Sequence, residues 1–88
     1  MLKDAGNKAF RDKDYHKAIR QYTRAIDISK EPHHTLYANR ASALLMLLSY
    51  DECIMDCNRA IDIEPKYIKA YFRKAKALAL RVQEEQQK

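Results

Sequence analysis

The chain has 88 residues, of which 47% are hydrophobic and 33% are charged, and its formal net charge is +5. This balance fits one soluble folded domain and argues against a disordered chain, while one glycine and two prolines are too few for a β-protein with many turns. No apolar run approaches the roughly 20 residues that a membrane-spanning helix needs. The excess of positive charge favours an acidic partner: nucleic acid, an anionic membrane or an acidic peptide.

Apolar residues recur at helical spacing in five segments. In chain order these cover about 2–12, 15–29, 33–47, 51–63 and 67–85. Pro32 precedes the third segment and Pro65 follows the fourth, as expected at helix boundaries. The breaks at 12–14 and 48–50 are short, so we expect the neighbouring helices to pack antiparallel. The sequence therefore predicts an all-α protein.

The sequence also repeats itself. The segment Arg24–Ile28 recurs unchanged 35 residues later as Arg59–Ile63, and Leu36–Leu44 is echoed 34 residues on by Ala70–Leu78. A period of about this length indicates stacked helical hairpins, each unable to bury its apolar face alone. We expect a single domain over residues 1–88, with repeat one at about 1–32, repeat two at about 33–66, and the first helix of a third repeat at about 67–85.

The small and apolar residues within this period resemble those of the tetratricopeptide repeat (TPR) family. The matching positions are Gly6, Tyr15, Ala18, Tyr22, Ala25, Tyr37, Ala41, Leu44, Tyr50, Cys53, Ala60, Pro65, Tyr71, Ala75 and Leu78. The resemblance implies a TPR-like superhelix of antiparallel helix hairpins, with two repeats plus a capping fifth helix. Where the family often has Gly inside each hairpin, this chain has Lys13 and Leu48. These two turns are either left-handed, at a cost of roughly 1–2 kcal/mol, or bent in a right-handed way.

One TPR subgroup carries a carboxylate clamp, and this chain has a residue of the right type at each clamp position. The five residues are Lys3, Asn7, Asn39, Lys69 and Arg73. Residues four apart on a helix share a face, which applies to Lys3 with Asn7 and to Lys69 with Arg73. In a TPR superhelix the odd-numbered helices line the concave side, so the resemblance implies that all five donors converge on one groove.

The subgroup's ligand is the acidic C-terminus, ending Glu-Glu-Val-Asp, of cytosolic heat-shock chaperones of the seventy- and ninety-kilodalton classes. Its last residue carries two carboxylates, which need hydrogen-bond donors when they leave water. The resemblance implies that Lys3, Asn7 and Asn39 hold the terminal carboxylate. It also implies that Lys69 holds the Asp side chain and that Arg73 holds the adjacent peptide groups. The chain is thus expected to be a co-chaperone or adaptor module.

Further groove residues are expected on the same helix faces. The candidates for side-chain pockets beside the clamp are Phe10, Ser42, Leu45, Met46 and Lys76. Phe10 and Leu45 fit the hydrophobic core equally well. Met46 suits a groove better, because methionine is adaptable and common at peptide-binding surfaces.

The two cysteines, Cys53 and Cys57, lie four residues apart at the repeat positions that Ala18 and Tyr22 occupy in the first repeat. We therefore expect them in the core rather than in a disulfide or a metal site, which would need further ligands. Free inward-facing thiols fit a reducing compartment, and hence a cytoplasmic location. No cofactor is expected.

Three other functions compete with peptide binding. An enzyme is not expected, because no Gly-rich phosphate loop or nucleophile elbow is present. Nucleic-acid binding would need a longer basic track with exposed stacking aromatics. Scaffolding by self-association is the remaining alternative: Ala43–Leu48 is apolar throughout, so Leu47 or Leu48 is expected at the surface. A weak homodimer through the fifth helix would bury an apolar stripe including Leu78 or Leu80.

Overall fold

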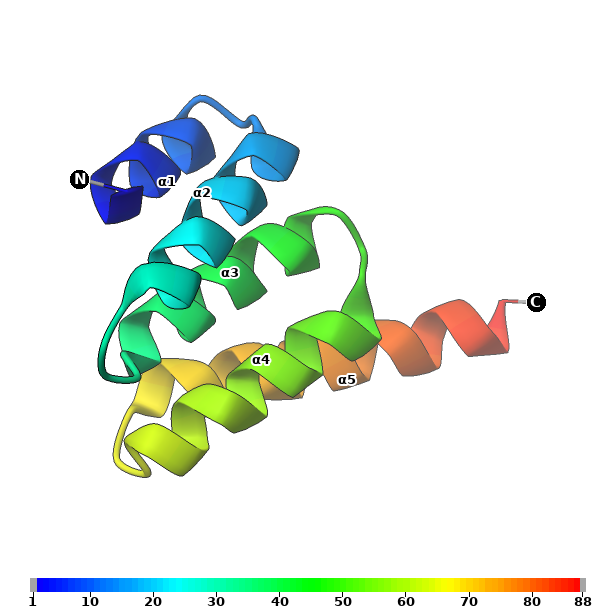
Figure 1. Cartoon of the computed structure of the whole chain (residues 1–88). Helices are drawn as coiled ribbons and strands as arrows, with labels where there is room; N and C mark the ends of the chain where they lie inside the picture. Colours follow the sequence, from blue (N-terminus) through cyan, green and yellow to red (C-terminus); the bar gives the residue numbers. More distant parts are fainter. Residues whose placement is uncertain (1, 88) are drawn as a thin grey trace.

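The computed structural model describes residues 2–87. They form five helices that follow one another in antiparallel hairpins (Figure 1): α1 (Leu2–Arg11), α2 (Tyr15–Ile28), α3 (His34–Met46), α4 (Tyr50–Ile63) and α5 (Ile68–Gln86). The predicted helix bounds agree with these to within one or two residues, and the predicted all-α class is confirmed.

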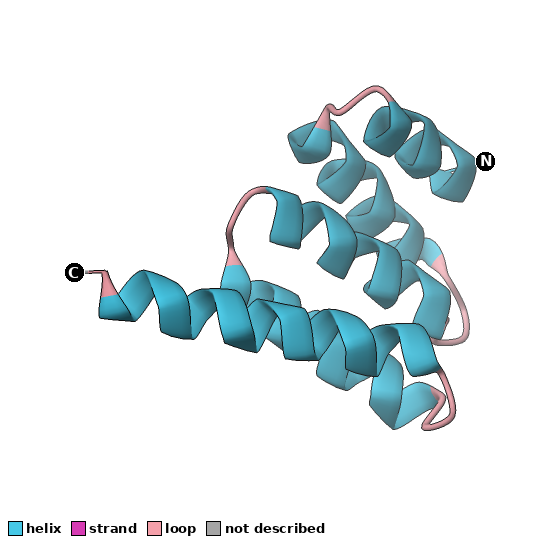
Figure 2. Cartoon of the chain, turned by 180° about the vertical axis from the view of Figure 1, so that it is seen from behind, coloured by secondary structure: helices cyan, strands magenta, loops and turns pink. Residues whose placement is uncertain are grey.

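The odd-numbered helices form a continuous row. Each helix packs on its neighbours in the chain, and in addition α1 contacts α3 and α3 contacts α5, whereas α2 and α4 do not meet anywhere in residues 2–87. A stack of hairpins is bent toward the side on which alternate helices touch. The row of α1, α3 and α5 is therefore the inner, concave side. In Figure 2 α5 crosses in front of α4, with α3 beside it.

Small side chains allow the helices to approach closely. The core contains at least one alanine from each of the five helices together with Tyr22, Leu36, Leu44 and the two cysteines, in three clusters along the stack. Cys53 and Cys57 are fully buried against Ala41, Leu44 and Ala77, as the repeat positions predict. Hydrogen bonding to Cys57, together with burial, raises the pKa of the Cys53 thiol. These thiols are therefore packing residues.

Both turns inside the hairpins are left-handed. Lys13 has φ 63° and Leu48 has φ 62°. In the first turn Asp14 N donates to Ala9 O (2.9 Å) and Lys13 N to Phe10 O (3.0 Å); the second turn repeats the pattern from Ser49 and Leu48. This is the Schellman arrangement, which satisfies carbonyls at a helix end and normally uses glycine. The alternative of a right-handed bend is wrong, because only a left-handed residue closes both hydrogen bonds.

The expected surface leucine is Leu48, which is 62% exposed, while Leu47 is half-buried. The prediction for the fifth helix needs correction: Leu78 and Leu80 are both half-buried, and the apolar residues that lack cover are Ile68 and Phe72, 79% and 73% exposed, with Val82. The difference follows from helix phase, because α5 buries Ala70 and Ala77 and therefore turns residues 68, 72 and 82 away from α4. In both views the C-terminal part of α5 extends beyond the other helices (Figures 1 and 2).

Among the described residues, no helix combines the length and apolar character needed to span a membrane.

Candidate functional site: a polar groove on the concave face

The concave face holds a pocket of about 230 Å³ between α1 and α3. Four of the residues predicted from the sequence line it: Asn7, Phe10, Asn39 and Ser42. Phe10 is also half-buried and stacks edge-on against Tyr15, with ring centroids 5.3 Å apart. Its side chain therefore contributes both to the core and to the pocket wall.

The two clamp asparagines meet in this pocket. Asn39 Nδ2 donates to Asn7 Oδ1 at 3.5 Å, and the hydroxyl of Tyr22 donates to the same oxygen. The carbonyl oxygen of Asn7 thus serves two protein donors. The amide nitrogen of Asn7 carries two N–H groups that take no part in these two bonds. They can therefore donate to the acceptor oxygens of a ligand.

Arg73 joins α5 to this region. Its guanidinium donates from Nη1 to the carbonyl oxygen of Ala38 at 3.1 Å, and that oxygen also accepts from the hydroxyl of Ser42 at 3.3 Å. Ala38 directly precedes Asn39. The bond therefore holds one end of the half-buried Arg73 side chain against α3, while the planar guanidinium retains further N–H donors for a ligand.

The lysines of the predicted site form no ion pairs within residues 2–87. All three, Lys3, Lys69 and Lys76, are exposed. Lys3 lies at the far end of α1, where it lines a separate hollow with Ser29 and His33. Exposed cations keep their charge available, in contrast to paired ones, so this face presents positive charge to an approaching ligand.

The remaining predicted groove residues are Leu45 and Met46 near the end of α3. Leu45 is half-buried and packs against the cluster that contains Cys53, so most of its surface belongs to the core. Met46 is 50% exposed. Neither lines the pocket between α1 and α3.

Sequence reasoning missed two residues of the pocket, Arg11 and Tyr22. Arg11 follows Asn7 by four positions, so its place on the same face of α1 was readable from helical spacing. Tyr22 was assigned to the core, and its ring is buried there. Nothing in the sequence reveals that its hydroxyl reaches Asn7, because the two residues are 15 positions apart on different helices.

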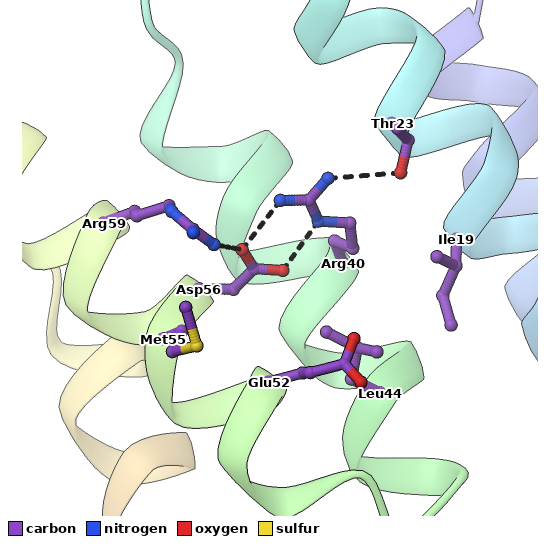
Figure 3. A pocket seen from close by; sticks show the side chains of 8 residues that line it. All are labelled: Ile19, Thr23, Arg40, Leu44, Glu52, Met55, Asp56 and Arg59. Atoms are coloured by element: carbon purple, nitrogen blue, oxygen red, sulfur yellow. Dashed lines mark hydrogen bonds and ion pairs between the residues drawn. The ribbon is translucent and has the colours of Figure 1, made fainter.

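A second polar cluster lies between α2, α3 and α4 (Figure 3). The Asp56 carboxylate is 1% exposed and receives two bonds from Arg40, from Nε at 2.7 Å and from Nη2 at 2.8 Å. Arg59 Nη1 donates to it at 2.7 Å, and Arg40 Nη1 donates to the hydroxyl of Thr23 at 3.1 Å. The hydrogen bond to Asp56 raises the pKa of Arg40. The single carboxylate of Asp56 is thus bonded by two guanidiniums, and the cluster borders a pocket of about 270 Å³.

Within residues 2–87, no group of three or more His, Cys, Asp or Glu side chains is arranged to hold a metal ion.

Comparison with known proteins identifies the family. The model described as "Serine/threonine-protein kinase BSK1-like, TPR repeats" matches residues 1–75. The chain belongs to the tetratricopeptide repeat family. It is 41% identical over 71 residues to heat shock protein STI1 of Saccharomyces cerevisiae, with 81% of this chain and 12% of that protein aligned. It is 42% identical over 79 residues to human mitochondrial import receptor subunit TOM70, with 85% and 13% aligned.

A solved TPR structure shares both fold and sequence. The second TPR of Spaghetti (RPAP3), bound to the HSP90 peptide SRMEEVD, superposes with a TM-score of 0.88 at 36% identity, covering 93% of this chain and 75% of that one. The TPR fold is therefore established by sequence and structure together. The chain spans only about an eighth of the length of the two curated relatives.

Proposed function

We propose that this TPR domain binds the acidic C-terminal peptide, of the Glu-Glu-Val-Asp type, of heat-shock chaperones of the seventy- and ninety-kilodalton classes, as a co-chaperone or adaptor module. The observation that carries the proposal is that three of the five predicted clamp residues, Asn7, Asn39 and Arg73, lie together. Asn7 and Asn39 share a hydrogen bond, and Arg73 is bonded to the residue next to Asn39. Support also comes from the RPAP3 structure, whose bound peptide ends in Glu-Glu-Val-Asp.

The chemistry of the groove suits a C-terminal aspartate. Such a residue brings two carboxylates, and each needs several donors once it leaves water. Lys69 and Arg73 on α5 offer positive charge, while Asn7 and Asn39 add neutral donors without raising the local charge further. Charge-assisted bonds contribute about 1.5–3 kcal/mol each. Because a flexible peptide loses entropy on binding, we expect micromolar affinity, about −8 kcal/mol.

Lys3, the predicted clamp residue on the first turn of α1, does not line the pocket that holds Asn7 and Asn39. It is exposed at the start of α1 and borders a hollow formed with the end of α2 and the start of α3. Its flexible stem allows the ammonium to reach toward the terminal carboxylate when a peptide is bound. We propose that Lys3 contributes charge, whereas Asn7 and Asn39 fix direction.

Catalysis and nucleic-acid binding fit this surface less well. Among residues 2–87, the groove combines amide donors with separated cations and holds no nucleophile paired with a base. Free carboxylates, rather than a run of phosphates, match such a donor set. We propose a cytosolic site of action, facing the chaperones that carry these tails.

A peptide titration tests the proposal. The protein is titrated with an acidic peptide ending Glu-Glu-Val-Asp, once with a free C-terminus and once amidated, using calorimetry. Amidation removes one charge, so we expect at least tenfold weaker binding, which corresponds to about 1.4 kcal/mol. An oligonucleotide of equal charge is the control and should not bind at moderate salt. Equal affinity for the two peptide forms would refute the clamp.

A second candidate function, self-association, is favoured by the exposed face of α5. Ile68, Phe72, Ala75, Ala79 and Val82 are spaced by four, three, four and three residues, and all five are exposed. The alternating spacing of this seam matches that of the apolar positions in a two-stranded coiled coil. In the repeat alignment Ala75 corresponds to Ala41, which is fully buried in the cluster that also holds Cys53 and Cys57 of α4 and Ala77 of α5.

The seam is suited to an antiparallel pair. Centred on Ala75, antiparallel pairing places Ile68 opposite Val82 of the other copy and Phe72 opposite Leu78, one residue from the small Ala79. Lys66, which precedes α5, then lies opposite Glu84 of the other copy, while Lys69 lies opposite Arg81. We therefore propose that a second copy of this chain occupies the seam.

Lys76 keeps this association weak. In the antiparallel register the Lys76 side chains of the two copies flank the crossing point, and each chain carries a net charge of +5. Screening by salt shortens the reach of this repulsion to about 8 Å at physiological ionic strength. We expect association to increase with salt, whereas peptide binding should decrease.

Sedimentation velocity at low and high salt tests the second function. Phe72→Glu should abolish association, because it places a charge in the seam. Ile28→Glu, which changes an equally exposed apolar residue on α2, should leave it intact. A protein that remains monomeric at both salt concentrations, up to high protein concentration, would refute the dimer.

A further inference from the structure

Tyr22 reaches the groove from the core, and Gly6 makes this possible. A Cβ atom added at Gly6 would lie 2.5 Å from Cε1 and 2.6 Å from Cδ1 of the Tyr22 ring. No side chain other than hydrogen fits there. The ring therefore lies directly against the backbone of α1, and its hydroxyl arrives beside Asn7, the next residue along that helix.

The hydroxyl determines how the Asn7 amide faces. A side-chain amide presents an acceptor oxygen on one side and two N–H donors on the other. Asn7 Oδ1 accepts from the Tyr22 hydroxyl and from Asn39 Nδ2. Turning the amide over would break both bonds: the proton of the Tyr22 hydroxyl would lose its acceptor, and the N–H groups of Asn7 and Asn39 would face each other. With Tyr22 present, the oxygen stays inward.

We propose that Tyr22 is a positioning residue that makes the groove selective for carboxylates by holding the Asn7 amide with its N–H donors toward the ligand. This inference rests on the proposed peptide-binding function. With the amide reversed, a lone pair would face the carboxylate and repel it. With the amide fixed, its conformational entropy is already lost in the free protein, so peptide binding does not have to order it.

Two further observations fit this role. Burial raises the pKa of the Tyr22 hydroxyl, so the group remains a donor throughout the physiological range. The equivalent position of the second repeat is Cys57, which has no hydroxyl and is packed among apolar neighbours. The tyrosine hydroxyl is therefore not needed to build a hairpin of this fold; it is present in the hairpin that carries Asn7.

The test compares Tyr22→Phe with Tyr15→Phe. Both remove one hydroxyl from a ring in the first hairpin, but only Tyr22 bonds to the groove. We expect Tyr22→Phe to weaken binding of a free-carboxylate peptide roughly three- to tenfold. Binding of the amidated peptide should change less, so the ratio of the two affinities shrinks. Tyr15→Phe should leave the ratio unchanged, and an unchanged ratio in Tyr22→Phe would overturn the proposal.

A double-mutant cycle separates positioning from general stability. In an Asn7→Ala background, Tyr22→Phe should cause no further loss of affinity, because its target is gone. The same loss with and without Asn7 would show a merely structural effect and overturn the proposal.

A readout without peptide distinguishes this inference from the proposed function. In the free protein, Tyr22→Phe should shift the side-chain amide resonances of Asn7 in a ¹H–¹⁵N spectrum, while Tyr15→Phe should not. An unchanged Asn7 resonance would refute positioning whatever the peptide data. A shifted resonance, in a protein that treats free and amidated peptides alike, would support positioning and refute carboxylate binding.

Discussion

Two polar regions adjoin neighbouring residues of α3, and they differ in how far their hydrogen-bonding capacity is used. At Arg40, a buried carboxylate accepts three hydrogen bonds from two guanidiniums, so its oxygens are already engaged within the protein. At Asn39, two amides share one oxygen, and the lysines nearby on α5 have no carboxylate partner among residues 2–87. A network whose polar groups bond to one another holds helices together. Donors on an open face that have no partner in the protein are available to a ligand.

This difference decides between two pockets of similar size. The pocket at Arg40, about 270 Å³, is larger than the groove pocket, about 230 Å³. A charged ligand in the larger pocket would have to compete with bonds that Asp56 already makes. In the groove, a carboxylate would find donors without breaking an ion pair. Of these two pockets, volume alone would favour the one whose carboxylate is already bonded within the protein.

The largest expected effect is a loss of stability at the cluster of Asp56 and Arg40. Asp56→Ala leaves Arg40 half-buried without its partner, so the free energy of unfolding should fall by about 3–5 kcal/mol in urea denaturation. Asp62→Ala, at an exposed position of the same helix, should change it by less than about 0.5 kcal/mol. A stable Asp56→Ala protein with reduced peptide binding would reverse the roles of the two regions.

In the groove, substitutions should reduce peptide affinity more than stability. Lys69→Ala removes an exposed cation and should weaken peptide binding by about tenfold, with less than about 0.5 kcal/mol lost in unfolding free energy. Lys66→Ala, which removes the same charge outside the predicted groove, is the matched control. Arg73→Ala should weaken binding similarly and also cost about 1 kcal/mol of stability, because its bond to Ala38 O is lost. Wild-type affinity in Lys69→Ala would argue against the groove.

A smaller substitution in the Arg40 cluster should also affect stability and not binding. Thr23→Val removes the hydroxyl that accepts from Arg40 Nη1 and keeps the shape of the side chain. We expect the free energy of unfolding to fall by about 1 kcal/mol, with no change in peptide affinity. Thermal and urea unfolding beside a peptide titration measure both. Loss of affinity without loss of stability would indicate that the Arg40 cluster contacts ligand.

The turn at Leu48 lies outside both polar regions, so a substitution there should change stability alone. Leu48 holds φ 62°, which costs a non-glycine residue roughly 1–2 kcal/mol, whereas glycine in the folded chain brings an entropic cost of about 0.5–1 kcal/mol. Leu48→Gly should therefore stabilise the protein by about 0.5–1 kcal/mol and leave binding unchanged. A drop in the urea midpoint would mean that packing of the Leu48 side chain outweighs backbone strain.

The sequence specified the fold more completely than the site. Helix bounds and buried cysteines followed from periodicity, because apolar spacing is a local property. The conformation of Lys13 and Leu48 did not, since a non-glycine residue permits either turn. The bidentate pairing of Arg40 with Asp56 joins residues 16 positions apart on two helices, and the Tyr22 hydroxyl reaches Asn7 across a similar separation. Such pairings depend on how the helices are placed, which a one-dimensional pattern does not encode.

We expect ligand to bind where hydrogen-bond donors lack protein partners, and not at Asp56, where the donors are already engaged. Side-chain ¹H–¹⁵N resonances test this expectation directly during titration with an acidic peptide that has a free C-terminus. We predict that the side-chain amide signals of Asn7 and Asn39 shift progressively, while the Nε–H signal of Arg40, bonded to Asp56, stays in place. A shift at Arg40 with static asparagine signals would contradict the account and move the binding site to the other face.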